Sequence, residues 1–274
     1  MFAELNSVLD IHQNCSLDGK FILVTDNQVD GNFIVSHFLS LYLKRNNSVC
    51  FLAFSQSFNH YNNIGLKLGI NCTRSREQKQ LVFIDGLKAC LESFVPTRSD
   101  RTSSTDCRNK SDCAFNFVSE VTSSPLRNLF ILVKEQLGIL ASRNCPTVLI
   151  IDDVEPLLDL GLSAADVVDF LNYISVYLKV PCQTSTNCLL VRTHHDTDID
   201  DERCNIVWTH CVHKSNLSIC ASGLASGFSK DVHGQIDIKW KDIDGEIEKE
   251  ESRQFKVEEN SLRLFAIGTS AAVL

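Results

Sequence analysis

Short apolar runs alternate with amphipathic stretches along the first two thirds of the chain. Residues 21–24 are a run of strand-favouring side chains, and the apolar positions from Phe33 to Tyr42 recur at helical spacing. The same alternation predicts strands at 49–54, 81–84, 147–151 and 188–193, and helices at 61–68, 87–94, 126–140 and 164–178. Strands separated by helices indicate an α/β fold with a mainly parallel central sheet flanked by helices.

The pattern changes after Asp196, where short strands are predicted without helices between them. They cover 206–212, 217–221, 235–240, 254–257 and 262–267. We expect an antiparallel C-terminal extension of the same sheet, within a single domain spanning 1–274. Residues 96–125 are mostly Ser, Thr, Asp, Arg and Asn, which predicts a mobile insertion with a short ordered piece near 115–118.

Composition and charge restrict the classes of function. Hydrophobic residues make up 44% of the 274, which is typical of a globular protein with a sizeable core. The net charge of −8 predicts that the chain alone binds nucleic acid weakly. Neither a secretion signal nor an apolar run of about 18 residues is found, so we expect no membrane span. The 12 cysteines include no Cys-X-X-Cys pair and are interpreted as reduced.

The first strand, loop and helix occupy the place where a nucleotide-binding protein carries its phosphate loop. That motif, G-x-x-x-x-G-K-[ST], wraps phosphates with backbone N–H groups and adds a lysine and a Mg²⁺-binding hydroxyl. Here Asp26 stands at the first glycine, Gly31 at the second, Asn32 at the lysine and Phe33 at the hydroxyl. Asp26 and Asp30 would also repel a polyphosphate. The sequence therefore predicts a degenerate loop that does not bind ATP.

The second nucleotide-binding element is better preserved. Residues 148–151 are an apolar strand that ends in Asp152 and Asp153, as in a Walker B motif, where an aspartate helps to hold Mg²⁺. An aspartate at the end of a buried strand also commonly caps a turn. Without the lysine and the hydroxyl we favour the capping role for Asp152. A composite site completed by a neighbouring subunit is the alternative.

Other candidate sites have weaker patterns. His194 and His195 follow a strand at the expected ligand-facing end of the sheet and could bind a metal ion, but they lack the paired spacing of a zinc site. A small basic cluster, Arg74, Arg76 and Lys79, could contact RNA phosphates or form a solvated face. The turn-rich segment 228–235 predicts a hairpin with Gly234 near the bend. Its side chains could contact a partner through Phe228, Lys230 and His233, or form a plain surface turn.

Several segments resemble one family. They are Met1–Asn6, residues 30–40, residues 56–62, the stretch 223–235 and the tail Ala271–Leu274, and they resemble the sixth-subunit family of the Elongator complex. The similarity runs over nearly the whole chain and fails mainly across 96–125.

The resemblance implies a RecA-like fold and an accessory, non-catalytic role. Members of the family join the fourth and fifth Elongator subunits in a hetero-hexameric ring that supports modification of the wobble uridine of tRNA. The implied partners are those two subunits, the catalytic Elongator subcomplex, and tRNA through the assembled ring. No cofactor or metal is implied, and the expected location is the cytoplasm, with the nucleus as a second location. A divergent ATPase using Asp152 and a metal-binding protein using His194 and His195 stay open as competing hypotheses.

Overall fold

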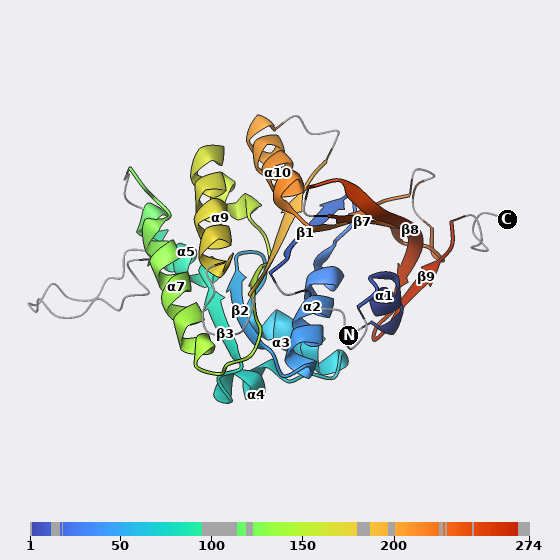
Figure 1. Cartoon of the computed structure of the whole chain (residues 1–274), viewed down its shortest axis with the longest axis horizontal. Helices are drawn as coiled ribbons and strands as arrows, with labels where there is room; N and C mark the ends of the chain where they lie inside the picture. Colours follow the sequence, from blue (N-terminus) through green and yellow to red (C-terminus); the bar gives the residue numbers. More distant parts are fainter. Residues whose placement is uncertain are drawn as a thin grey trace, which may run out of the picture.

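A computed structural model describes residues 2–11, 17, 19–94, 114–118, 123–179, 187–196, 201–224, 227, 229–242 and 244–267 (Figure 1). Its strands are β1 (Phe21–Asn27), β2 (Ser48–Ala53), β3 (Leu81–Asp85), β4 (Thr147–Ile151), β5 (Cys188–His194), β6 (Leu217–Ser222), β7 (Gly234–Lys241), β8 (Ile247–Val257) and β9 (Leu262–Phe265). Its helices are α1 (Ala3–Val8), α2 (Asn32–Lys44), α3 (Phe58–Lys67), α4 (Cys72–Glu77), α5 (Gly86–Phe94), the 3₁₀ turn η1 (Asn116–Val118), α7 (Arg127–Ala141), α8 (Glu155–Asp159), α9 (Ala164–Lys179) and α10 (Glu202–Lys214).

All these strands form one sheet, in the order β3-β2-β4-β5-β1-β6-β7-β8-β9. The pairs from β3 to β6 are parallel, and those from β6 to β9 are antiparallel. The predicted parallel sheet with an antiparallel C-terminal extension is therefore confirmed. Because the carboxyl ends of β1, β4 and β5 are neighbours, the residues that follow these strands meet at one edge of the sheet.

Two apolar cores lie on opposite faces of the sheet, because successive strand side chains point to opposite sides. In β1, Ile22 and Val24 join the core under α1, α2 and α3, whereas Phe21 and Leu23 join the core under α7, α9 and α10. Both faces of the parallel strands are thus covered, as Figure 1 shows, which explains why their sequences are continuously apolar rather than alternating.

The prediction of a strand at 206–212 was wrong. The β-branched residues there favoured a strand, but α10 occupies the segment and buries Val207 and Cys211, four residues apart on one helical face. Asp201 caps the helix by accepting a hydrogen bond from the N–H of Arg203 at 2.9 Å. This helix makes the crossover from β5 to β6, so β6 pairs parallel with β1 and the antiparallel part begins only at β7.

Capping residues and glycines in the sequence placed most other ends of helices and strands within a few residues of their positions in the structure. Ser163 caps α9 as expected, with the N–H of Asp166 donating to its hydroxyl at 3.2 Å, and Gly69 takes the left-handed conformation after α3. Phe115 just before η1 and Phe117 within it are buried, which confirms the ordered piece near 115–118. The rest of the predicted insertion, 95–113 and 119–122, lies outside the described residues.

Gly234 lies just after the bend at Lys230 and Asp231 rather than in it. It is the first residue of β7, and a Cβ there would lie 2.3 Å from the carbonyl oxygen of Ser222 on the neighbouring strand. Close backbone approach, rather than a turn, explains the glycine. In the part of the chain that the structure describes, no helix is long and apolar enough to cross a membrane.

Helix α1 was not predicted, and a buried histidine holds the residue before it. The N–H of Phe2 donates to Nδ1 of His37 at 3.0 Å, and the two rings stack with centroids 5.8 Å apart. His37 is fully buried in α2, and burial, reinforced by the positive charge of Lys44, lowers its pKa to about 3. The imidazole is therefore neutral near pH 7, as an acceptor for Phe2 must be.

Candidate functional site

The carboxyl ends of β1, β4 and β5 bring together a buried set of charged side chains. Asp26 lies directly opposite His194 in the β1–β5 register, and Asp152 and Asp153 follow β4 next to β5. Asp26 and Arg192 are almost completely buried, with relative exposures of 1% and 4%. Charges so far from water require compensating partners, and the contacts among these residues supply them.

Asp26 is the centre of this set. Its Oδ2 accepts hydrogen bonds from Nη2 of Arg192 at 2.7 Å, from Nε of Arg192 at 3.1 Å and from the N–H of Gly31 at 2.7 Å. Its Oδ1 is in contact with Nδ1 of His194. Burial alone would raise the pKa of Asp26, but the hydrogen bond from His194 and the charge of Arg192 bring the pKa below its ordinary value.

Arg192 links the ends of all three strands. Besides Asp26, its guanidinium contacts the carbonyl oxygen of Asp152 at 3.4 Å, Oδ2 of Asp153 at 3.9 Å and Oδ1 of Asp30 at 3.4 Å. The sequence interpretation missed this residue. The available signal was a lone arginine inside the apolar strand 188–193, because a buried charge at such a position needs an acid on a neighbouring strand.

His194 is a protonated bridge between two acids. Its Nε2 lies 3.0 Å from Oδ2 of Asp153, while Nδ1 faces Asp26. The hydrogen bonds to Asp153 and Asp26 raise its pKa to about 10, against an opposing effect of burial, so the ring is charged at neutral pH.

A metal ion here would compete with the His194 bridge. Ligand atoms of Asp153, Glu155 and His194 lie within 4.8 Å of one another. Because Nε2 of His194 lies 3.0 Å from Oδ2 of Asp153 and the pKa of the ring is raised to about 10, a metal ion would have to displace the proton on this nitrogen. His195 does not complete a pair with it, because its ring stacks on Trp208 with centroids 3.7 Å apart.

The loop in the phosphate-binding position uses its N–H groups internally. While Gly31 donates to Asp26, the N–H of Asn32 donates to Oδ1 of Asp30 at 2.8 Å. In a working phosphate loop such N–H groups point at the ligand. The Asn32 side chain lies 3.3 Å from Nε2 of His60, and Phe33 packs against Phe255 with ring centroids 5.1 Å apart.

Asp152 holds the loop after the neighbouring strand β2. Its carboxylate accepts hydrogen bonds from the N–H groups of Phe54 at 2.6 Å, Ser55 at 3.2 Å and Gln56 at 3.3 Å, and from the Tyr61 hydroxyl at 2.8 Å. Burial raises the pKa of Asp152 to about 6, and the hydrogen bonds that it accepts oppose this rise. This is the geometry of a turn cap, although the capped turn follows β2 rather than β4.

The predicted basic cluster lies at the opposite edge of the sheet. Arg74, Arg76 and Lys79 are exposed in and after α4, just before the amino end of β3. The structure adds Arg143, which the sequence interpretation did not include. Its guanidinium donates to the carbonyl oxygen of Gln78 at 3.1 Å and to Oδ1 of Asn46 at 3.1 Å, which ties the end of α7 to this cluster.

The predicted partner-contact segment is described only in part. Phe228 lies outside the described residues, and Lys230 and His233 are exposed just before β7. Nδ1 of His233 accepts a hydrogen bond from the N–H of Val257 at 3.2 Å, so the end of the segment is fixed to β8.

Comparisons with known structures support the fold. The chain is similar to a KaiC-like protein from Pyrococcus horikoshii, with a TM-score of 0.57 and 10% identity over 91% of this chain and 90% of that one. It is also similar to an uncharacterised protein of the same archaeon in complex with an unknown peptide, with a TM-score of 0.63, 11% identity and coverage of 96% and 98%. The expected RecA-like fold class is confirmed.

Sequence comparisons identify the family. The family model described as "Elongation complex protein 6" matches residues 2–259. The chain is 37% identical to Elongator complex protein 6 of Homo sapiens and 35% identical to that of Danio rerio, in each case over the full length of both chains. Identity to the protein of that name in Dictyostelium discoideum is 26%, over 92% of this chain and 91% of that one. This chain therefore belongs to the Elongator complex protein 6 family and is an Elongator subunit with a RecA-like fold.

Proposed function

We propose that this chain is a non-catalytic ring subunit of Elongator. It assembles with the fourth and fifth subunits into a hetero-hexameric RecA-like ring, and that ring supports wobble-uridine modification of tRNA by binding or releasing the tRNA. Family membership supports the Elongator role, and the observation that carries the non-catalytic role is the closed phosphate loop, in which Asp26 accepts hydrogen bonds from Gly31 and Arg192.

The closed loop opposes nucleotide binding in two ways. A phosphate entering it would meet the carboxylates of Asp26 and Asp30, and like charges at about 4 Å repel by roughly 1 kcal/mol even in water. It would also have to take the N–H of Gly31 and the guanidinium of Arg192 from Asp26, and breaking a buried ion pair costs about 3–5 kcal/mol. The Asp26 carboxylate thus takes the place that the phosphate of a ligand would occupy in a working loop.

Assembly is tested by co-expression. The tagged chain, produced with the fourth and fifth Elongator subunits, is expected to purify as one species with the mass of a hetero-hexamer in light scattering. A chain that stays monomeric and binds neither subunit would contradict the proposal.

The exposed end of segment 228–235 offers a first interface variant. Lys230→Glu combined with His233→Asp is expected to lower the yield of hexamer, because both exposed side chains are proposed to face a neighbouring subunit. Lys88→Glu, at an exposed position on α5, is the control and should leave the yield unchanged.

We propose that tRNA contacts the ring through the basic cluster of Arg74, Arg76, Lys79 and Arg143. The first three are exposed, come from one short stretch and are joined to the end of α7 by Arg143. Clustered cations attract phosphates even on a protein of net charge −8, because only nearby charges escape screening by salt.

Arg74→Glu combined with Lys79→Glu is expected to weaken tRNA binding by the assembled ring about ten-fold at physiological salt. Each lost phosphate contact should also reduce the slope of log Kd against log salt by about one. Binding isotherms at several salt concentrations measure both quantities. An equal loss with Lys88→Glu and Lys239→Glu, an exposed and a half-buried lysine outside the cluster, would show that only net charge matters and would contradict the assignment.

A further inference from the structure

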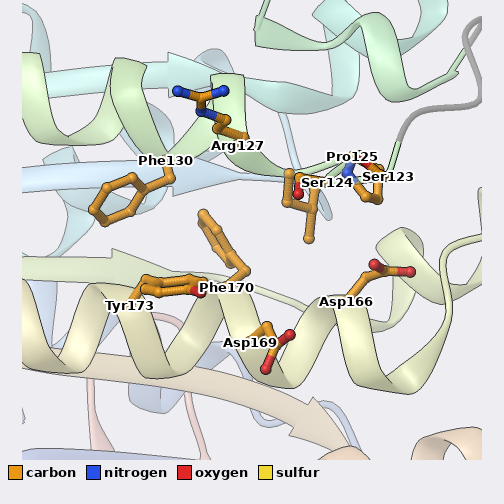
Figure 2. Close-up of a pocket in the computed structure, with 10 residues that line it drawn as sticks. Ser123, Ser124, Pro125, Arg127, Phe130, Asp166, Asp169, Phe170 and Tyr173 are labelled. Atoms are coloured by element: carbon orange, nitrogen blue, oxygen red, sulfur yellow. The ribbon is translucent and has the colours of Figure 1, made fainter.

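A pocket of about 430 Å³ opens on the protein surface between α7 and α9. Figure 2 shows Phe130 of α7 facing Phe170 and Tyr173 of α9 across it. Residues 123–125, which lead into α7, close one end, and Arg127, Asp166 and Asp169 add polar groups to the lining. Helices α7 and α9 cover the face of the sheet whose core includes Phe21 and Leu23 of β1.

The apolar lining continues out of the pocket onto the surface. Tyr173 and Val176 are 64% and 65% exposed, and Ile131 on α7 is 41% exposed. The Phe130 ring lies 6.1 Å from the Tyr173 ring and 6.3 Å from the Tyr177 ring, so the aromatic side chains form one contiguous patch. Tyr173 and Val176, both on α9, are among the ten large apolar side chains that are exposed in the described part of the chain, and neighbouring exposed apolar side chains mark interaction surfaces.

The charges around this patch differ between its two helices, because the basic residues Arg127 and Lys134 belong to α7, with Nζ of Lys134 5.6 Å from the centroid of the Tyr177 ring. Asp166 is engaged in capping, since Ser163 donates to its Oδ2 at 2.5 Å, whereas Asp169 forms no ion pair with any residue that the structure describes. Two carboxylates therefore line the α9 side of the pocket, and Arg127 lines the α7 side. An occupant that complements this surface carries basic side chains along its α9 edge.

We propose that the α7–α9 groove binds an amphipathic helix of a partner protein, with an apolar stripe against Phe130, Phe170 and Tyr173 and basic side chains beside Asp169. A groove between two helices, lined by aromatic rings, suits a helix whose apolar positions recur every three or four residues. A second copy of this chain fits less well, because a symmetric contact would bring two acidic α9 surfaces into one interface. This inference stands apart from the proposed assembly of the ring.

The test uses the full-length chain and two fluorescent helical peptides of about 18 residues, long enough to form an amphipathic helix. Both peptides carry the same stripe of leucines. Beside this stripe, the lysine peptide has a row of lysines and the glutamate peptide has a row of glutamates. Fluorescence anisotropy is expected to show about ten-fold tighter binding of the lysine peptide. Asp169→Lys should reverse this preference, and Tyr173→Ala with Val176→Ala should weaken binding of the lysine peptide about ten-fold.

Ile247→Ala, an exposed apolar side chain on β8, is the matched control and should change neither affinity. Circular dichroism confirms that each variant is folded. The proposal is overturned if neither peptide binds, if both bind equally, or if Asp169→Lys leaves the preference unchanged. It is also overturned if light scattering shows a dimer that Val176→Ala dissociates, because a second copy then occupies the groove.

Discussion

Arg192→Met is expected to destabilise the protein by about 3–5 kcal/mol, because it removes from the buried Asp26 the guanidinium that donates two hydrogen bonds to it. The side chains are similar in length, so the main loss is the charge and its hydrogen bonds rather than packed volume. Urea denaturation of the wild-type protein and the variant measures the difference in the free energy of unfolding.

A double variant separates the ion pair from its surroundings. In Arg192→Met with Asp26→Asn, the amide oxygen can still accept a hydrogen bond from Gly31 and no unpaired carboxylate remains. Its stability should exceed the value expected from the two single changes by about 2 kcal/mol or more. Arg263→Met removes an exposed pair with Glu258 and should cost less than about 1 kcal/mol. A similarly small loss for Arg192→Met would show that the network does not hold the loop closed.

The buried histidine of α2 is expected to make the protein acid-sensitive. The pKa of His37 is about 3 in the folded state and 6.5 when unfolded, so the unfolded chain binds a proton first as the pH falls. Stability is therefore lost from about pH 6.5 downwards, and this histidine alone should cost about 2 kcal/mol between pH 8 and pH 5. Protonation would also remove the acceptor for the N–H of Phe2 and release α1.

The readout is the comparison with His37→Phe. Asp152 titrates in the opposite direction, since its raised folded pKa of about 6 adds stability as the pH falls, so the total curve alone is uninformative. The change in unfolding free energy from pH 8 to pH 5 should be about 2 kcal/mol more favourable in His37→Phe than in the wild type. His213→Gln, at an exposed position on α10, should match the wild type, and identical pH profiles for His37→Phe and wild type would refute the assignment.

The parallel half of the fold could be predicted because each of its strands is buried on both faces and is separated from the next by an amphipathic helix. The strand Thr147–Ile151 is an example, because all five of its residues are buried and polar turns lie on both sides of it. α10 could not be recognised in the same way. Its buried face consists of Val207 and Cys211 alone, and its β-branched residues favour strands when read locally.

The candidate site was predictable only in outline. The loss of the lysine and the hydroxyl from the loop is visible in the sequence at Asn32 and Phe33. That Asp26 and Arg192 neutralise each other is not, because they are 166 positions apart and meet only when β1 pairs with β5. The role of Asp152 likewise depends on β2. The N–H groups that donate hydrogen bonds to the Asp152 carboxylate belong to the loop that follows this strand.

The most direct test of the closed loop is a calorimetric titration of Mg²⁺–ATP into the full-length chain, alone and in the ring with its partner subunits. For the chain alone we expect no saturable binding up to about 1 mM, because Asp26 already occupies the N–H of Gly31 and the guanidinium of Arg192. In the ring, Asp152→Ala should leave any nucleotide binding or turnover unchanged. Stoichiometric binding by the lone chain, abolished by Asp152→Ala, would contradict the account and make this subunit an ATPase.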